Sequence, residues 1–188
     1  MVLQKYPLCE KAYLLRAQIY SSLGESDRAL GDISALAEYN PVFSSFMIKA
    51  QWLEKAGYFS EAREAYKKAL EESTEEKDRF MILEASGDIE FLLKNYQEAI
   101  SCYKEISQKP TEEISFKIAR AAFYAKDYKT TIEYLEPIES KLTSSLKAQS
   151  LYYKGVIAQK DKKDIEAIAF LEESLSLGGV HEEDIHLI

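Results

Sequence analysis

The chain has 188 residues, of which 46% are hydrophobic and 30% charged, so it can bury the core of one domain or one repeat array. Its seven Gly and four Pro are too few for a loop-rich or all-β protein. The net charge of −8, with no concentrated stripe of Lys and Arg, disfavours nucleic acid and anionic membrane surfaces as main partners. No apolar run approaches the roughly 18 residues of a spanning helix, and no signal peptide is visible. We therefore expect no membrane insertion and a cytoplasmic protein.

Ten helices are predicted, and they follow one another as five short antiparallel pairs. The first helices are expected at 10–23, 43–56, 77–93, 111–125 and 144–160. The second helices are expected at 26–38, 59–72, 96–107, 128–140 and 164–177. Apolar residues recur every three or four positions in the second helices, as in Ala62, Tyr66, Ala69 and Leu70. That period is typical of a helix with one buried face.

The turn inside each predicted pair falls at an equivalent position. Gly24 and Gly57 occupy it in the first two pairs, where a tight turn needs a permissive backbone. In the last three pairs the residues there are Lys94, Lys126 and Lys162. The longest connections between pairs, around 71–78 and 139–146, are polar enough to be solvated.

Small residues repeat with a fixed spacing of twelve. The pairs are Ala17 and Ala29, Ala50 and Ala62, Gly87 and Ala99, Ala119 and Thr131, and Gly155 and Ala167. Two short helices can cross closely only where the side chains at the crossing are small. The five pairs therefore predict the same close contact in five successive helical hairpins.

The second unit combines small residues at Ala50, Ala62 and Ala69 with a turn glycine, Gly57, and an aromatic residue, Tyr66. This combination resembles the tetratricopeptide repeat family. The resemblance implies an all-α fold, a right-handed superhelical solenoid of antiparallel helix–turn–helix repeats. It also implies a single array over 1–188, with units near 10–42, 43–76, 77–110, 111–143 and 144–178.

Both ends of the sequence look like parts of further repeats. Residues 1–9 are interpreted as the tail of a preceding repeat, because Pro7 stands to the first unit as Pro41 stands to the second. Residues 179–188 are interpreted as a linker or the start of a further helix. Natural arrays normally end in polar capping units, and no clear cap is visible. A fragment of a larger repeat protein is therefore favoured, with a short protein that has an irregular capping turn as the alternative.

In the tetratricopeptide family, set positions of the first helices line a concave groove. The resemblance places Gln18, Ser21, Ser22, Gln51, Glu54, Lys55, Glu113 and Gln149 at such positions. Carried onto this sequence, the resemblance implies a tentative peptide-binding groove in its later half, made of Met81, Glu84, Asp88, Phe91, Leu92, Phe116, Arg120, Phe123, Tyr124 and Tyr152. An exposed apolar cluster of this kind would be a partner site. The alternative, that several of these aromatic side chains pack between neighbouring helices, stays open.

Other kinds of chemistry find little support. Glu84 and Asp88 lie four apart on one helical face, but nothing completes a metal or acid–base site around them. The sequence holds no Ser–His–Asp set, Gly-rich phosphate loop or CxxC motif, so no enzyme activity, cofactor or metal is expected. Glu90 stands where the family usually has an aromatic residue, and either a Lys partner or a slightly rotated helix would explain it.

One branch of the family binds the C-terminal carboxylate of heat-shock chaperones with a clamp of Lys, Asn and Arg. The matching positions hold Leu14, Gln18, Ile48, Met81 and Ala85, and none of these fits. That partner is therefore excluded. The expected function is a non-catalytic scaffold or adaptor that binds another protein, as a peptide or a helix, in the groove. The alternative is a regulatory or targeting arm of a larger protein or enzyme, and uncapped end helices would also allow self-association.

Overall fold

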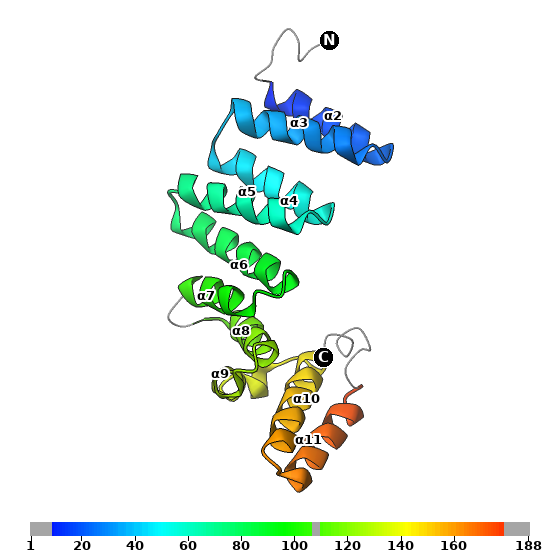
Figure 1. Ribbon diagram of the computed structural model, residues 1–188, viewed down its shortest axis with the longest axis vertical. Helices are drawn as coiled ribbons and strands as arrows, with labels where there is room; N and C mark the ends of the chain where they lie inside the picture. Colours follow the sequence, from blue (N-terminus) through cyan, green and yellow to red (C-terminus); the bar gives the residue numbers. More distant parts are fainter. Residues whose placement is uncertain (1–8, 107–109, 179–188) are drawn as a thin grey trace. The chain divides into compact units, whose positions relative to one another are not determined.

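The computed structural model describes residues 9–106 and 110–178, and within them the chain forms helices joined by short turns (Figure 1). The elements are α2 (Glu10–Ser22), α3 (Ser26–Tyr39), α4 (Phe43–Lys55), α5 (Phe59–Glu72), α6 (Glu76–Leu92), α7 (Tyr96–Ile106), α8 (Glu112–Tyr124), α9 (Tyr128–Leu135), a 3-10 turn η1 (Glu139–Lys141), α10 (Ser144–Lys160) and α11 (Asp164–Ser176). The ten predicted helices are confirmed. The interpretations of residues 1–8 and 179–188 lie outside the described residues.

Two compact units divide the chain, 1–102 and 103–188. In the first unit α2 packs against α3, α3 against α4, α4 against α5 and α5 against α6. In the second unit α8 packs against α9, α10 packs against α11, and α9 contacts α10. Each unit is therefore built from antiparallel helical hairpins. Among the described residues no helix has the length and apolar character to span a membrane.

The small residues spaced by twelve form the contact inside each hairpin, as predicted. All ten are buried, and Ala17, Ala50, Ala62 and Ala119 are fully so. The contact is tight between α10 and α11, where a Cβ atom built on Gly155 would lie 2.7 Å from Cγ of Leu171. No side chain larger than hydrogen fits there without displacing the partner helix or its leucine.

The turns inside the hairpins need a left-handed backbone. Gly24 and Gly57 have φ of 76° and 81°. The lysines at the equivalent place, Lys94, Lys126 and Lys162, have φ of 63°, 61° and 60°. A side chain in this region costs roughly 1–2 kcal/mol, because its Cβ crowds the backbone. The hairpin therefore forces three lysines into a conformation that glycine adopts freely.

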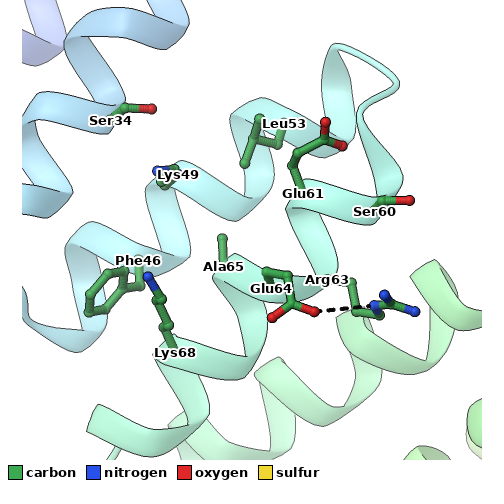
Figure 2. A pocket seen from close by; sticks show the side chains of 10 residues that line it. All are labelled: Ser34, Phe46, Lys49, Leu53, Ser60, Glu61, Arg63, Glu64, Ala65 and Lys68. Atoms are coloured by element: carbon green, nitrogen blue, oxygen red, sulfur yellow. Dashed lines mark ion pairs between the residues drawn. The ribbon is translucent and has the colours of Figure 1, made fainter.

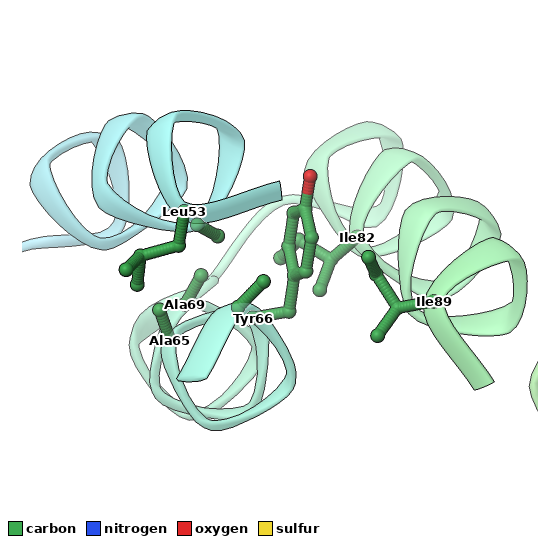
Figure 3. Close-up of a cluster of buried hydrophobic side chains, with 8 residues drawn as sticks. Leu53, Ala65, Tyr66, Ala69, Ile82 and Ile89 are labelled. Atoms are coloured by element: carbon green, nitrogen blue, oxygen red, sulfur yellow. The ribbon is translucent and has the colours of Figure 1, made fainter. Parts of the chain in front are cut away.

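One hairpin also packs on the next through a face of its second helix. In the first unit Tyr66 of α5 lies beside Ile82 and Ile89 of α6 (Figure 3). All three side chains are buried, and Leu70 packs against the same cluster. The Tyr66 hydroxyl donates a hydrogen bond of 2.7 Å to Oε2 of Glu54, so this large residue leaves no unpaired polar atom in the core.

Two local predictions need correction. The helix expected over 128–140 ends at Leu135, because Pro137 has no amide hydrogen to donate to the carbonyl four residues earlier, and its ring crowds that carbonyl. The chain then makes the 3-10 turn η1 before α10 begins. Glu90 is half-buried, and its partner is no Lys: it accepts a hydrogen bond of 2.7 Å from Nδ2 of Asn95.

We predict opposite effects of one substitution at two helical glycines. Gly155→Ala should destabilise the fold by about 1–3 kcal/mol, because the new methyl group overlaps Leu171. Gly31→Ala should stabilise it by about 0.5–1 kcal/mol, because Gly31 is exposed in α3 with open space around it and Ala favours the helix. Urea unfolding measures both. Equal effects would contradict the tight crossing.

A second prediction concerns the hairpin turns. Gly57→Ala should destabilise the fold by about 1–2 kcal/mol through backbone strain alone, since nothing lies within 4 Å of its added Cβ. Lys126→Gly should stabilise it by about 0.5–1 kcal/mol. The substitution relieves backbone strain in the folded state, and part of that gain is lost because glycine raises the conformational entropy of the unfolded chain. Thermal unfolding of both variants checks the signs, and a less stable Lys126→Gly would rule out strain at this turn.

Candidate functional site

Five of the predicted groove residues lie on α6 in the first unit. Met81 and Leu92 are exposed, with 44% and 51% of their surface open, while Glu84, Asp88 and Phe91 are half-buried. Phe91 packs edge-on against Tyr96, with ring centroids 5.4 Å apart. Burial and the hydrogen bond to Glu54 raise the pKa of Tyr66, and the negative charge of Asp88 raises it further.

The other five lie in the second unit, and only three of them are open to solvent. Arg120, Tyr124 and Tyr152 are half-buried, whereas Phe116 and Phe123 are only 4% and 7% exposed. Phe116 and Phe123 therefore do not form an exposed apolar surface, and the packing alternative holds for these two. The reason is the neighbouring hairpin, which supplies aromatic partners from α10.

Tyr153 lies in the middle of this aromatic cluster, and the sequence analysis did not predict its role. Its ring stacks on Phe123 at 4.3 Å between centroids and lies 6.4 Å from Phe116. Tyr152 also contacts Phe123, and burial raises the pKa of Tyr152. Tyr153 is fully buried, two residues before Gly155. Its only sequence signal was an aromatic residue close to the small residue of the helix crossing.

A pocket of about 570 Å³ opens in the second unit between α8 and α10. Four of the side chains that line it occupy groove positions implied by the family resemblance: Glu113, Phe116, Arg120 and Gln149. The other lining residues are Thr111, Glu112, Lys117, Lys141, Leu142, Thr143 and Leu146. The groove positions of two successive first helices therefore converge on one cavity.

The connection 139–146 supplies the part of this pocket that the sequence reasoning missed. It was expected to be a solvated joint, but Leu142 and Leu146 are half-buried and pack against the aromatic cluster. Thr143 caps α10 by accepting a hydrogen bond from the Leu146 amide at 3.5 Å. The sequence Thr-x-x-apolar was the available signal, since a capping Thr fixes where a helix begins.

The N-terminus of α8 forms the opposite wall. Thr111 accepts a hydrogen bond from the Ile114 amide at 3.3 Å and so caps this helix. Nζ of Lys141 donates a hydrogen bond of 2.7 Å to Oε1 of Glu112 across the pocket mouth. This bond lowers the pKa of Glu112 below its usual range. The rim thus carries both signs of charge over an apolar floor.

The first unit has a smaller cavity at the equivalent place, about 440 Å³. Its lining is Gln18, Ser21, Ser22, Gln51, Trp52 and Lys55. Five of the six occupy predicted groove positions of the first two repeats; Trp52 is the exception. The groove positions of neighbouring first helices thus lie together in this unit also, with hydroxyl, amide and ammonium groups beside the Trp52 side chain.

A third cavity, about 600 Å³, is lined by residues outside the predicted groove positions (Figure 2). Figure 2 shows Phe46, Lys49 and Leu53 of α4 facing residues of α5, with Ser34 contributed by α3. Its lining presents Lys49, Arg63 and Lys68 against Glu61 and Glu64, an excess of one positive group. Arg63 pairs with Glu64 at 3.6 Å, and Lys68 lies over the Phe46 ring.

In the described part of the chain, no group of three or more His, Cys, Asp and Glu residues is close enough to hold a metal ion. Glu84 and Asp88 share one turn of α6 but gather no third carboxylate. The residues at the clamp positions of the chaperone-binding branch are those named above, so no converging set of cations forms there.

A titration tests the pocket rim. Lys141→Gln should raise the pKa of Glu112 toward its ordinary value, because the charged donor is lost. A lowered folded pKa stabilises the fold above the unfolded pKa, and this contribution disappears as pH falls through the folded value. Carboxyl NMR shifts of Glu112 between about pH 2 and 7 measure the change. Lys147→Gln is the matched control, since Lys147 pairs with Glu173 instead.

Comparison with known proteins agrees with this architecture. Residues 14–77 and 49–113 match the tetratricopeptide repeat family, and together they span just over half of the chain. A stretch of 97 residues, 50% of this chain, is 32% identical to DnaJ homolog subfamily C member 3 of Gallus gallus and covers only 19% of that protein.

Solved structures show the same fold. YrrB, described as a TPR protein with an unusual peptide-binding site, superposes with a TM-score of 0.73 at 15% identity, over 98% of this chain and 94% of its own. MamA from Desulfovibrio magneticus RS-1 gives a TM-score of 0.73 at 14% identity, over 89% and 94%. This fold suggests a protein–protein interaction scaffold, and proteins of this kind are generally non-catalytic. The chain is an all-α solenoid that belongs to the tetratricopeptide repeat family.

Proposed function

We propose that this protein is a non-catalytic interaction scaffold that binds a peptide segment of a partner protein in the pocket between α8 and α10. The observation that carries the proposal is the convergence of groove positions from two successive repeats on one cavity of about 570 Å³. Cavities of this size are typical of ligand sites, and an extended segment can place one or two side chains in them. The peptide-binding site described for YrrB supports the same use of the fold.

The lining of the pocket indicates what the segment carries. The floor is apolar, made of Phe116, Leu142 and Leu146. A large aliphatic or aromatic side chain would displace water from it, which is the usual source of affinity in such anchors. Because Phe116 is packed into the core from behind, the floor is rigid and needs no ordering when the partner binds.

The rim indicates the charge of the flanking residues. It presents Lys117, Arg120 and Lys141 against Glu112 and Glu113, an excess of one positive group. The whole chain carries −8, so this excess is opposite in sign to the net charge. We infer a partner segment with an apolar anchor beside one acidic residue, since a carboxylate gains most from convergent Lys and Arg donors.

A second candidate function is an interaction arm of a larger protein. The similarity to the DnaJ homolog from Gallus gallus supports it, because the matched stretch is a small part of that longer protein. Both candidates use the same pocket. The full coding sequence distinguishes them, since an arm requires a further domain in the same reading frame.

A peptide-display experiment tests the pocket. The probe is a library of random peptides selected on the full chain, and the expected consensus has a large apolar residue next to Asp or Glu. Lys141→Glu should weaken binding of the selected peptides by about tenfold or more, because it replaces an attractive charge with a repulsive one at an exposed position. Isothermal titration measures the dissociation constants.

The control for this experiment is Lys147→Glu, which makes the same charge change in the adjoining helix α10 but outside the pocket lining. Its dissociation constants should match those of the unchanged chain. If the selected peptides bind both variants equally well, or lack an acidic residue, the pocket is not their site.

A further inference from the structure

Two repeat positions lie opposite each other inside the hairpins. One is the residue just before the first small residue of the twelve-residue spacing, and the other is the third residue after the second small residue. In the first hairpin these positions hold Arg16 and Asp32. Nε of Arg16 donates a hydrogen bond of 2.6 Å to Oδ2 of Asp32, and Nη2 donates another to Oδ1. Asp32 is only 5% exposed, so this carboxylate is an internal partner of the cation.

The last hairpin also supplies partners for a cation at this position. Lys154 stands just before Gly155, and its Nζ lies 5.8 Å from the ring centroid of Phe170, three residues after Ala167. The same Nζ donates a hydrogen bond of 2.6 Å to Oε2 of Glu139. In these two hairpins, the chain itself therefore fills the space opposite the cation and balances its charge.

The second hairpin has the cation but not the partner. Lys49 stands just before Ala50, and the opposite position, three residues after Ala62, holds Ala65. Lys49 is half-buried, and its ammonium group forms no ion pair or hydrogen bond with another described residue. Lys49 and Ala65 both line the cavity of about 600 Å³ in Figure 2. This cavity, which we call the Lys49 cavity, therefore opens where the first hairpin carries a carboxylate.

We propose that the Lys49 cavity accepts an acidic side chain of a partner protein, whose carboxylate pairs with Lys49 as Asp32 pairs with Arg16. The partner supplies from outside the charge that the first hairpin carries within its own sequence. Hydrogen bonds between two ionised groups are roughly twice as strong as those between neutral ones. Phe46, Leu53 and Ala65 give the cavity an apolar floor, against which the carbon atoms of the entering side chain pack.

The remaining charges show at which end the carboxylate enters. Lys49 and Lys68 lie toward Phe46, and Nζ of Lys68 is 5.8 Å from the centroid of that ring (Figure 2). Glu61 lies at the other end, beside Leu53. Four residues of α4 separate Lys49 from Leu53, which is about 6 Å along the helix. The partner segment therefore carries an acidic residue at the Phe46 end and a basic residue about one helical turn away, toward Glu61.

The other two charged residues of the lining do not alter this pattern, because Arg63 and Glu64 pair with each other at 3.6 Å. No residue of the Lys49 cavity lines the pocket between α8 and α10, and the cavity belongs to the first unit. The acidic side chain is thus bound at a second contact surface, separate from the peptide pocket. One contact can be lost without the other.

A carboxylate placed within the chain tests the pairing without a partner. Ala65→Asp introduces a carboxylate opposite Lys49, and Ala65→Asn introduces a neutral side chain of the same shape. The thermal midpoint of Ala65→Asp should be higher than that of Ala65→Asn by about 2–4 °C. In a chain that also carries Lys49→Gln, the two variants should unfold at the same temperature. Equal midpoints with Lys49 present would overturn the proposal, because the cavity would then give a carboxylate no advantage.

The partner is tested with a library of random peptides, selected on the full chain carrying Lys141→Glu. This background weakens the pocket between α8 and α10, so that acidic peptides are selected elsewhere. The expected consensus is Asp or Glu with Lys or Arg two to four residues away. In this background, Lys49→Gln should raise the dissociation constants about tenfold or more, because the cation that binds the carboxylate is lost. Ala65→Asp should raise them similarly, since its own carboxylate occupies Lys49.

The matched control is Lys67→Gln, which removes an exposed lysine of α5 that does not line the Lys49 cavity. Its dissociation constants should equal those of the Lys141→Glu chain, and circular dichroism checks that each variant folds. A selection that yields no acidic peptide, or peptides that bind Lys49→Gln and Ala65→Asp undiminished, would overturn the proposal. Neither result bears on the peptide pocket, since that pocket is tested by Lys141→Glu in the otherwise unchanged chain.

Discussion

The close crossing of two helices at a pair of small residues is the contact on which the rest of this structure depends. Ala50 and Ala62 are both without exposed surface, and the other four pairs are buried in the same way. Because the helices approach so closely, their larger side chains must point out of the hairpin, toward the next repeat or toward the groove. The position of each large residue relative to the small pair therefore decides whether it becomes core or surface.

Tyr66 shows how this constraint works in detail. It stands four residues after Ala62, on the face that meets α6, and so its ring lies among Ile82 and Ile89. Tyr103 stands four residues after Ala99 and is also fully buried. A hydrophobic helix face built on tyrosine must bring a hydroxyl into the core, and each such hydroxyl needs a partner. Each buried tyrosine of this chain therefore needs a hydrogen-bond partner for its hydroxyl group.

Most of the fold could be predicted from the sequence, because spacing carries it. The twelve-residue repeat located all five hairpins, and the turn positions followed, including the lysines that replace glycine. The predicted end of α9 was wrong, because it followed from the repeat length alone. Pro137, a helix-breaking residue, was the sequence signal for the earlier end. Spacing locates elements well, but local backbone chemistry decides where a helix ends.

The candidate site was harder to predict, for two physical reasons. Phe116 and Tyr124 both stand at groove positions, yet one is core and the other half-open, because that difference depends on how closely α10 approaches. The helical period of a single segment does not show how closely a neighbouring helix packs against it. Leu142 and Leu146 were overlooked because their connection is mostly polar, and only the packed structure shows that two leucines turn inward from it.

The groove and the repeat packing are therefore not independent features. Glu54 stands at a groove position implied by the family resemblance, and its carboxylate accepts a hydrogen bond from the hydroxyl of Tyr66, which lies in the core. Asp88, another groove position, is near enough for its charge to raise the pKa of the same phenol. A charge added to or removed from the groove would act on a residue that joins α5 to α6.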